Sequence, residues 1–147
     1  AFFEDCLERL RHKGSLDLLK KCWIAIHNQT WQPVGYDADA TGFKKFQFYD
    51  RILRRKLGVS RPVIATEGGF QTGGNPAMNE RHRDWNIDYY KYMAKAEPWF
   101  LAQCHWILGN DVGGGDPGMW EDATWFKPSG PMPIVEALKK MPKHSRP

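Results

Sequence analysis

The feature that most constrains the fold is a regular alternation of amphipathic segments with short apolar runs. The apolar runs lie at 22–26, 62–66 and 100–108, and about 40 residues separate one run from the next. This alternation is typical of parallel strands joined by right-handed helical crossovers. The sequence therefore predicts an α/β fold with three parallel strands and four helices.

The expected helices have recognisable ends. The first covers 3–10, the second covers 43–57, the third runs from 79 to about 96, and the last starts near 133. Gly58, directly after the last apolar position of the second helix, is typical of a helix C-terminus.

Long loops are expected after the strands, and they favour one architecture over another. A free-standing doubly wound domain usually has loops of about two to six residues, whereas the loops expected at 27–41 and 67–77 are longer. Long loops at strand C-termini are typical of a (β/α)8 barrel, which needs roughly 250 residues. We therefore expect residues 1–147 to be the C-terminal portion of a single barrel domain, a partial TIM barrel with about the last three strands.

Glu67 is the strongest candidate for a catalytic residue. It follows the apolar run 62–66 and precedes Gly68 and Gly69, so its carboxylate is expected where a buried strand opens into a loop. A charge at such a place loses hydration, and proteins retain it mainly where the group has a partner or a task. We therefore predict a chemical role for Glu67, with a solvated loop carboxylate as the alternative.

Three expected strand ends together resemble a known family. They are the Ile-His-Asn sequence at 26–28, the Thr-Glu-Gly sequence at 66–68 and the His-Trp pair at 105–106. These look like strands six, seven and eight of the large clan of retaining (β/α)8 glycoside hydrolases, which includes cellulase, mannanase and glucosidase types. The Thr-Glu-Gly sequence is the most specific part, and the resemblance in organisation covers nearly the whole chain.

The resemblance implies roles for individual residues. In the clan the strand-seven Glu is the nucleophile, a strand-six His orients it, and a strand-eight Trp lines a sugar subsite, which here implies Glu67, His27 and Trp106. The clan often has Tyr two residues after the His, where this chain has Gln29. The clan's acid/base Glu follows an Asn at the end of strand four, so it is expected in an N-terminal half, and this chain alone is expected to be inactive.

Further binding residues are expected beside Glu67. A retaining mechanism uses two carboxylates roughly 5 to 5.5 Å apart, and a donor such as His27 or Asn28 would keep the nucleophile ionised. Sugar rings present C–H patches that pack on aromatic faces. The aromatic residues in or near the expected strand-end loops are therefore predicted to bind substrate: Trp31, Tyr36, Trp106 and Trp120.

These residues predict a retaining glycoside hydrolase that acts on the O-glycosidic bonds of a polysaccharide or glycoside. Two alternatives stay open: a non-catalytic carbohydrate-binding barrel that keeps the aromatic residues, and another barrel enzyme that uses Glu67 as a base or metal ligand. No cofactor is predicted, and the acidic residues among the glycines at 111–122 lack the spacing of a calcium loop.

The expected open sheet and the distribution of charge indicate which partners to expect. An open three-stranded sheet exposes two edges and an apolar face, so we expect the chain to bind the N-terminal half of the barrel or to self-associate. The net charge of +4 comes without a basic stripe, which argues against a nucleic-acid partner, and no apolar run approaches the length of a membrane span.

The odd number of widely spaced cysteines predicts buried free thiols: Cys6, Cys22 and Cys104.

Overall fold

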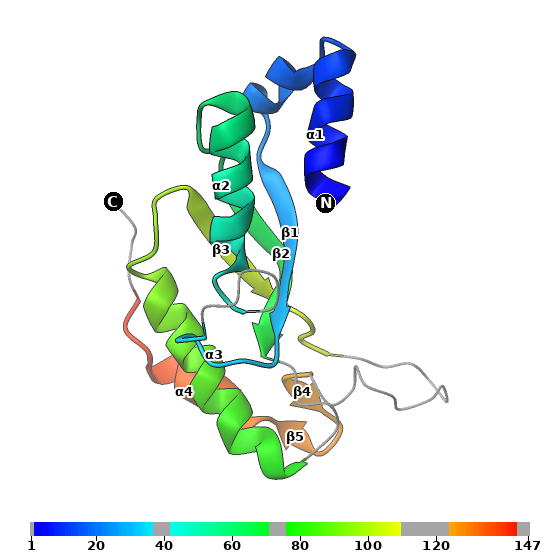
Figure 1. Cartoon of the computed structure of the whole chain (residues 1–147). Coiled ribbons are helices and arrows are strands. Elements are labelled where there is room, and N and C mark those ends of the chain that lie inside the picture. Colours follow the sequence, from blue (N-terminus) through cyan, green and yellow to red (C-terminus); the bar gives the residue numbers. More distant parts are fainter. Residues whose placement is uncertain (1, 37–41, 71–75, 110–123, 144–147) are drawn as a thin grey trace.

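The computed structural model describes residues 2–36, 42–70, 76–109 and 124–143 (Figure 1). The four α-helices and the three strands of the main sheet follow one another in the predicted order. The elements are α1 (Phe2–His12), η1 (Leu16–Lys21), β1 (Ile24–Thr30), α2 (Lys45–Leu57), β2 (Val63–Phe70), η2 (Pro76–Met78), α3 (Asn79–Met93), β3 (Phe100–His105), β4 (Phe126–Lys127), β5 (Gly130–Pro131) and α4 (Pro133–Lys140).

The main sheet has three parallel strands in the order β1-β2-β3, which confirms the predicted mixed α/β fold with a parallel sheet. The strands β4 and β5 form a separate antiparallel pair that the sequence did not predict. Each of these strands has two residues, too few to show a periodic pattern.

The first two strands extend beyond their predicted ranges at the carboxyl end, whereas β3 ends at His105, before the predicted residue 108. The strand β1 continues through Thr30 and β2 through Phe70, although the sequence analysis placed Thr30, Glu67 and Phe70 in loops. Continuous apolar runs predict the first two strands, so the polar residues that follow each run lie outside the predicted ranges. Here polar residues alternate between a buried and an exposed side of the ladder, as in β1, where Asn28 is buried and His27 is exposed.

One face of the sheet is covered by α2, by α3 and by the segment before α2. Phe46 of α2 stacks on Phe100 of β3 with 3.9 Å between ring centroids, and Phe43 stacks on Tyr89 of α3 at 4.3 Å. The strands contribute five buried apolar residues to this face: Ile26, Val63, Ala65, Phe70 and Phe100. We call it the helix-covered face.

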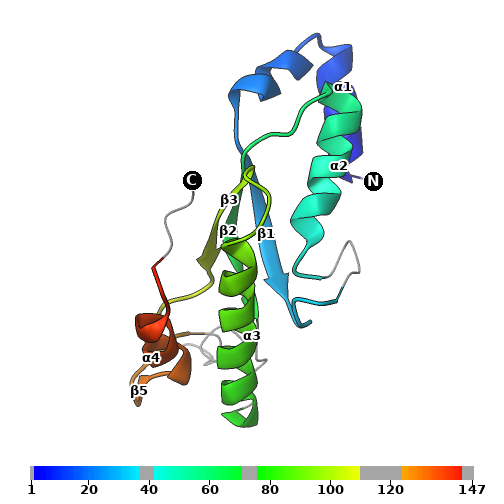
Figure 2. The same cartoon turned by 90° about the vertical axis from the view of Figure 1, so that its left-hand side faces the viewer.

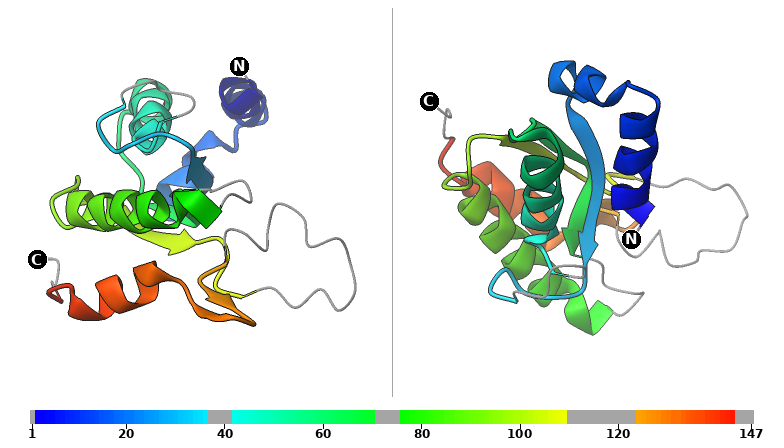
Figure 3. Two further views of the ribbon diagram at one scale, coloured as in Figure 1. Left: turned by 90° about the horizontal axis from the view of Figure 1, so that it is seen from below. Right: turned by 45° about the horizontal axis from the view of Figure 1, so that its top comes forward.

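The opposite face of the sheet is open. Ala25 and His27 of β1 are exposed, and Ile64 of β2 is half-buried. The helix α3 runs along the sheet with α1 and α2 on one side and α4 on the other (Figure 2), and seen from below α3 lies between α2 and α4 (Figure 3). All four helices thus leave this open face uncovered within the described residues.

The described helices and cysteines bear on two further properties. No helix in the described ranges is both long and apolar enough to cross a membrane. All three cysteines are free, but the prediction of buried thiols is wrong for Cys22 and Cys104, which are exposed, and Cys6 is only half-buried. Cys104 alternates with the buried Gln103 on β3 and so lies on the open face.

Candidate functional site

Glu67 lies within β2 rather than after it, at an irregularity of the sheet. The β1–β2 register shifts between Ile26 and His27, so Ile26 pairs with Ala65 whereas His27 pairs with Glu67. An extra residue of this kind re-aims the side chains next to it. The result is that Glu67 lies directly across from His27 on the open face.

The Glu67 carboxylate is held at one of its two oxygens. Its Oε2 lies 3.4 Å from His27 Nδ1 and 3.5 Å from Gln29 Nε2. Among the described residues, no hydrogen bond to Oε1 occurs. The side chain of Glu67 is 26% exposed and that of His27 is 65% exposed, so the carboxylate can be reached from solvent.

Gln29 is a site residue that the sequence analysis noted only as a departure from the Tyr of the resembling clan. Its amide donates to Glu67, and its backbone carbonyl accepts a 2.6 Å hydrogen bond from Lys45 Nζ at the start of α2. Burial lowers the pKa of Lys45. The signal that could have identified Gln29 is its position two residues after His27, on the same face of one strand.

The predicted binding residues differ in their surroundings. Asn28 is fully buried and donates from Nδ2 to Gln103 Oε1 at 2.7 Å, behind the open face. The side chains of Trp31 and Tyr36, which follow β1, are 59% and 41% exposed. Trp106 follows β3 and donates its backbone N–H to Gly68 O at 2.9 Å. Trp120 lies outside the described residues.

Glu67 is the only acidic residue on the three strands of the main sheet. The other acids of the described residues lie on helices or, for Glu97, in the segment between α3 and β3. The same part of the chain contains no group of three or more His, Cys, Asp or Glu side chains placed to hold a metal ion. The described residues therefore supply one carboxylate, where a retaining mechanism uses two.

A buried polar cluster behind the site was missed by the sequence analysis. The ring of His82 on α3 meets the ring of His105 edge-on at 5.6 Å, and Asn86 Oδ1 accepts from Phe70 N at 3.0 Å. His82 is fully buried, and desolvation, with smaller effects of His105 and Lys127, lowers its pKa to about 3. These residues tie the end of β2 to α3.

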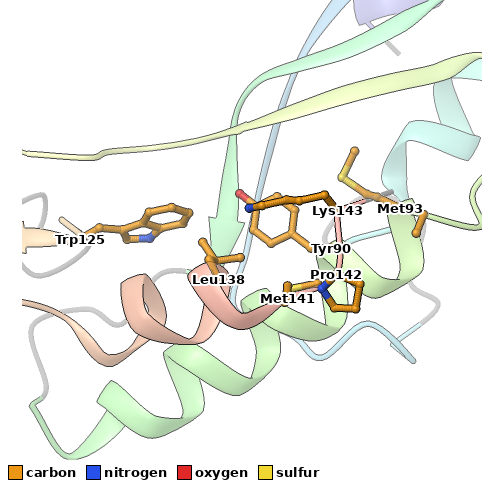
Figure 4. A pocket seen from close by; sticks show the side chains of 8 residues that line it. Tyr90, Met93, Trp125, Leu138, Met141, Pro142 and Lys143 are labelled. Carbon is orange, nitrogen blue, oxygen red and sulfur yellow. The ribbon is translucent and has the colours of Figure 1, made fainter. Parts of the chain in front are cut away.

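A cavity of about 460 Å³ lies elsewhere, between α3 and α4 (Figure 4). Its lining is largely apolar and includes Tyr90, Met93, Trp125, Leu138 and Met141. Burial raises the pKa of Tyr90 to about 12. The cavity shares no lining residue with the Glu67 site.

Comparison of the chain with protein-family models, with curated proteins and with solved structures gave no match. A function for the Glu67 site therefore has to be inferred from its residues and their geometry.

Proposed function

We propose that Glu67 is the nucleophile of a retaining glycoside hydrolase. The observation that carries the proposal is the asymmetry of its carboxylate: His27 and Gln29 both lie at Oε2, and Oε1 is left without a hydrogen bond among the described residues. A nucleophilic carboxylate needs this division, since one oxygen must be oriented and the other must be free to attack.

The chemistry assigns a separate task to each group. Oε1 of Glu67 forms a bond to the anomeric carbon while the bond from that carbon to the leaving oxygen breaks, and the leaving group departs with the electron pair. His27 and Gln29, both at Oε2, orient the carboxylate for the attack. Trp31 and Tyr36, exposed after β1, offer aromatic faces to the sugar rings.

The chain is further proposed to be the C-terminal part of a (β/α)8 barrel. Parallel strands in sequential order, with helices on one face and an open opposite face, fit a barrel wall whose open face would become the interior. Glu67 lies in the carboxyl-terminal half of β2, the end at which barrel enzymes carry their sites, and it faces His27 at the middle of β1.

The missing strands define the expected partner. Both outer strands, β1 and β3, have an unpaired edge in the described sheet, and unpaired edges bind further strands. An N-terminal half of the barrel would pair with both edges and supply the acid/base carboxylate. Self-association through the same edges is the other outcome.

The experiment uses a substrate that does not need the missing acid. A 2-deoxy-2-fluoro glycoside with a dinitrophenolate leaving group departs without protonation, so the nucleophile alone can form the glycosyl-enzyme ester. Incubation of the chain should add the mass of one fluoroglycosyl group, and peptide mapping should locate it on Glu67. The Glu67→Gln variant should give no adduct, and the matched variant Glu80→Gln, on α3, should react like the wild type.

The same experiment decides between hydrolase and carbohydrate-binding barrel. The single acid on the main sheet favours the binding protein as second candidate. Quenching of Trp fluorescence by the glycoside without any adduct would support that candidate. An adduct that persists in the Glu67→Gln variant would refute the proposed role of Glu67.

A further inference from the structure

We infer that Asn28, Gly68 and Gln103 form a clamp across the three strands that fixes Glu67 and His27 on the same face of the sheet. The clamp consists of the Asn28–Gln103 hydrogen bond and the glycine beneath it. Its members are positioning residues, because they act on Glu67 and His27 from behind the sheet. That Glu67 is the reacting group rests on the proposed function, whereas the clamp itself does not.

The clamp is a direct contact between the two outer strands of the sheet. Asn28 Nδ2 of β1 donates to Gln103 Oε1 of β3 at 2.7 Å, although β2 lies between these strands. Asn28 is fully buried and Gln103 is 9% exposed. A buried amide hydrogen bond is costly to break, because each amide group would be left without a partner.

Gly68 is what allows Gln103 to reach Asn28. A Cβ built on Gly68 would lie 2.8 Å from both Cγ and Cδ of Gln103, closer than such atoms approach in proteins. The Gln103 side chain therefore crosses β2 directly over the glycine. Any larger residue at this position would push Gln103 away from Asn28.

The clamp lies beside two register shifts of the sheet, and this location explains its role in positioning Glu67 and His27. The register shifts on both sides of β2 near Glu67: between Ile26 and His27 toward β1, and between Ala65 and Gly68 toward β3. A slip of one residue moves a side chain to the other face of a sheet. Asn28 pairs with Gly68, one residue beyond the His27–Glu67 pair. The clamp therefore fixes the pairing of the strands directly beside the irregular backbone pairing at Glu67.

The test measures the proximity of His27 and Glu67 directly, in the isolated chain. Wild-type protein should show a through-space NMR contact between the His27 ring protons and the Glu67 γ-methylene. Gln103→Met, which fills the same space but cannot bond Asn28, should lose this contact while contacts between Ile24 and Val63 persist. Gly68→Ala should lose it as well.

Two further variants make the test specific. In the Gln103→Ala background, Gly68→Ala should cause no further loss of thermal stability, because the side chain that it meets is absent. The matched control is Gln47→Met, which removes a 2.7 Å hydrogen bond from Gln47 Nε2 to Glu97 Oε1 and leaves the clamp untouched. This control should lower the melting temperature and keep the His27–Glu67 contact.

The inference is overturned if the His27–Glu67 contact is absent in the wild type, or if it survives in Gln103→Met or Gly68→Ala. If Gln103→Met does not fold, Gln103→Asn replaces it, since its shortened side chain stays polar but no longer reaches Asn28. Failure of the proposed function is seen separately, as a missing glycosyl adduct on Glu67 with the NMR contact intact.

Discussion

The two ends of the main sheet are built in opposite ways. At the amino end the first rung, Ile24, Val63 and Phe100, is apolar, and a single register shift follows it, between Val63 and Ile64 toward β3. Toward the carboxyl end the register shifts beside Glu67 on both sides of β2, and a buried polar clamp is added to the apolar packing of Phe70. Stability is therefore expected to depend mainly on the amino end, and chemistry on the carboxyl end.

The aromatic packing of the amino end should give the largest loss of stability. Phe46 is fully buried and stacks on Phe100 at 3.9 Å, so Phe46→Ala should lower the free energy of unfolding by about 3–5 kcal/mol. Urea unfolding followed by circular dichroism measures the loss. Phe2→Ala is the control, because Phe2 is 83% exposed and should cost little. Equal losses in both variants would contradict the assignment of the core to this end.

The amino end was also the more predictable from sequence. The apolar run before residue 66 and the helical spacing of Phe43, Phe46 and Leu53 predicted the parallel strands and the helix that covers them. Gly58 ends α2 as expected, with a left-handed φ of 76°. Local pattern sufficed here because apolar burial and helix capping act over a few residues.

A pair of glycines tests the difference in crowding between the two ends. Gly69, toward the carboxyl end, and Gly58, after α2, both have positive φ, but a Cβ on Gly69 would lie 2.3 Å from His105 Nδ1, whereas one on Gly58 would meet nothing within 4 Å. Gly58→Ala should cost about 1 kcal/mol from backbone strain alone. Gly69→Ala should cost roughly 2–4 kcal/mol because overpacking adds to the strain.

Thermal unfolding of the two glycine variants in parallel measures this difference. A second pair, Gly14→Ala with Gly58→Ala, serves as control, since Gly14 also has positive φ and open space around it. If Gly69→Ala lost no more stability than Gly58→Ala and Gly14→Ala, the carboxyl end would be less tightly packed than its contacts indicate.

The buried His82 should make the carboxyl end sensitive to acid. Desolvation first, then His105 and Lys127, lowers its pKa from 6.5 to about 3, so below pH 6.5 the unfolded chain binds a proton that the folded chain does not. The free energy of unfolding should therefore fall as the pH decreases through this range, by about 2 kcal/mol between pH 7 and pH 5.

The variant His82→Phe isolates this effect. Both ring nitrogens of His82 lack a hydrogen-bond partner within the described part of the chain, so an aromatic ring of similar shape removes the titration without breaking a bond there. Urea titrations at several pH values should give a flatter profile for the variant. A profile as steep as that of the wild type would assign the acid sensitivity to other groups.

The carboxyl end was the less predictable from sequence, and Asn28 and Gln29 show why. Both follow His27 on one strand, yet Asn28 is buried against Gln103 and Gln29 faces Glu67. Their opposite directions follow from the alternation along β1, but which side chains they meet depends on the register shift between β1 and β2, a property of two strands that neither segment encodes alone. Glu67 could be identified because its local surroundings are unusual, whereas its partners depend on pairing.

The smallest effect is expected from the surface ion pairs of the amino end. Arg55 of α2 contacts Glu4 of α1, and the Arg55 side chain is 60% exposed. Exposed pairs contribute about 0–1 kcal/mol, so Arg55→Gln should shift the urea midpoint little, and less still in high salt because of screening. The apolar contact of Leu7 with the residues of α2 holds these helices together instead. A loss as large as that of Phe46→Ala would mean that charge rather than apolar packing stabilises this end, and the contrast between the two ends of the sheet would have to be drawn differently.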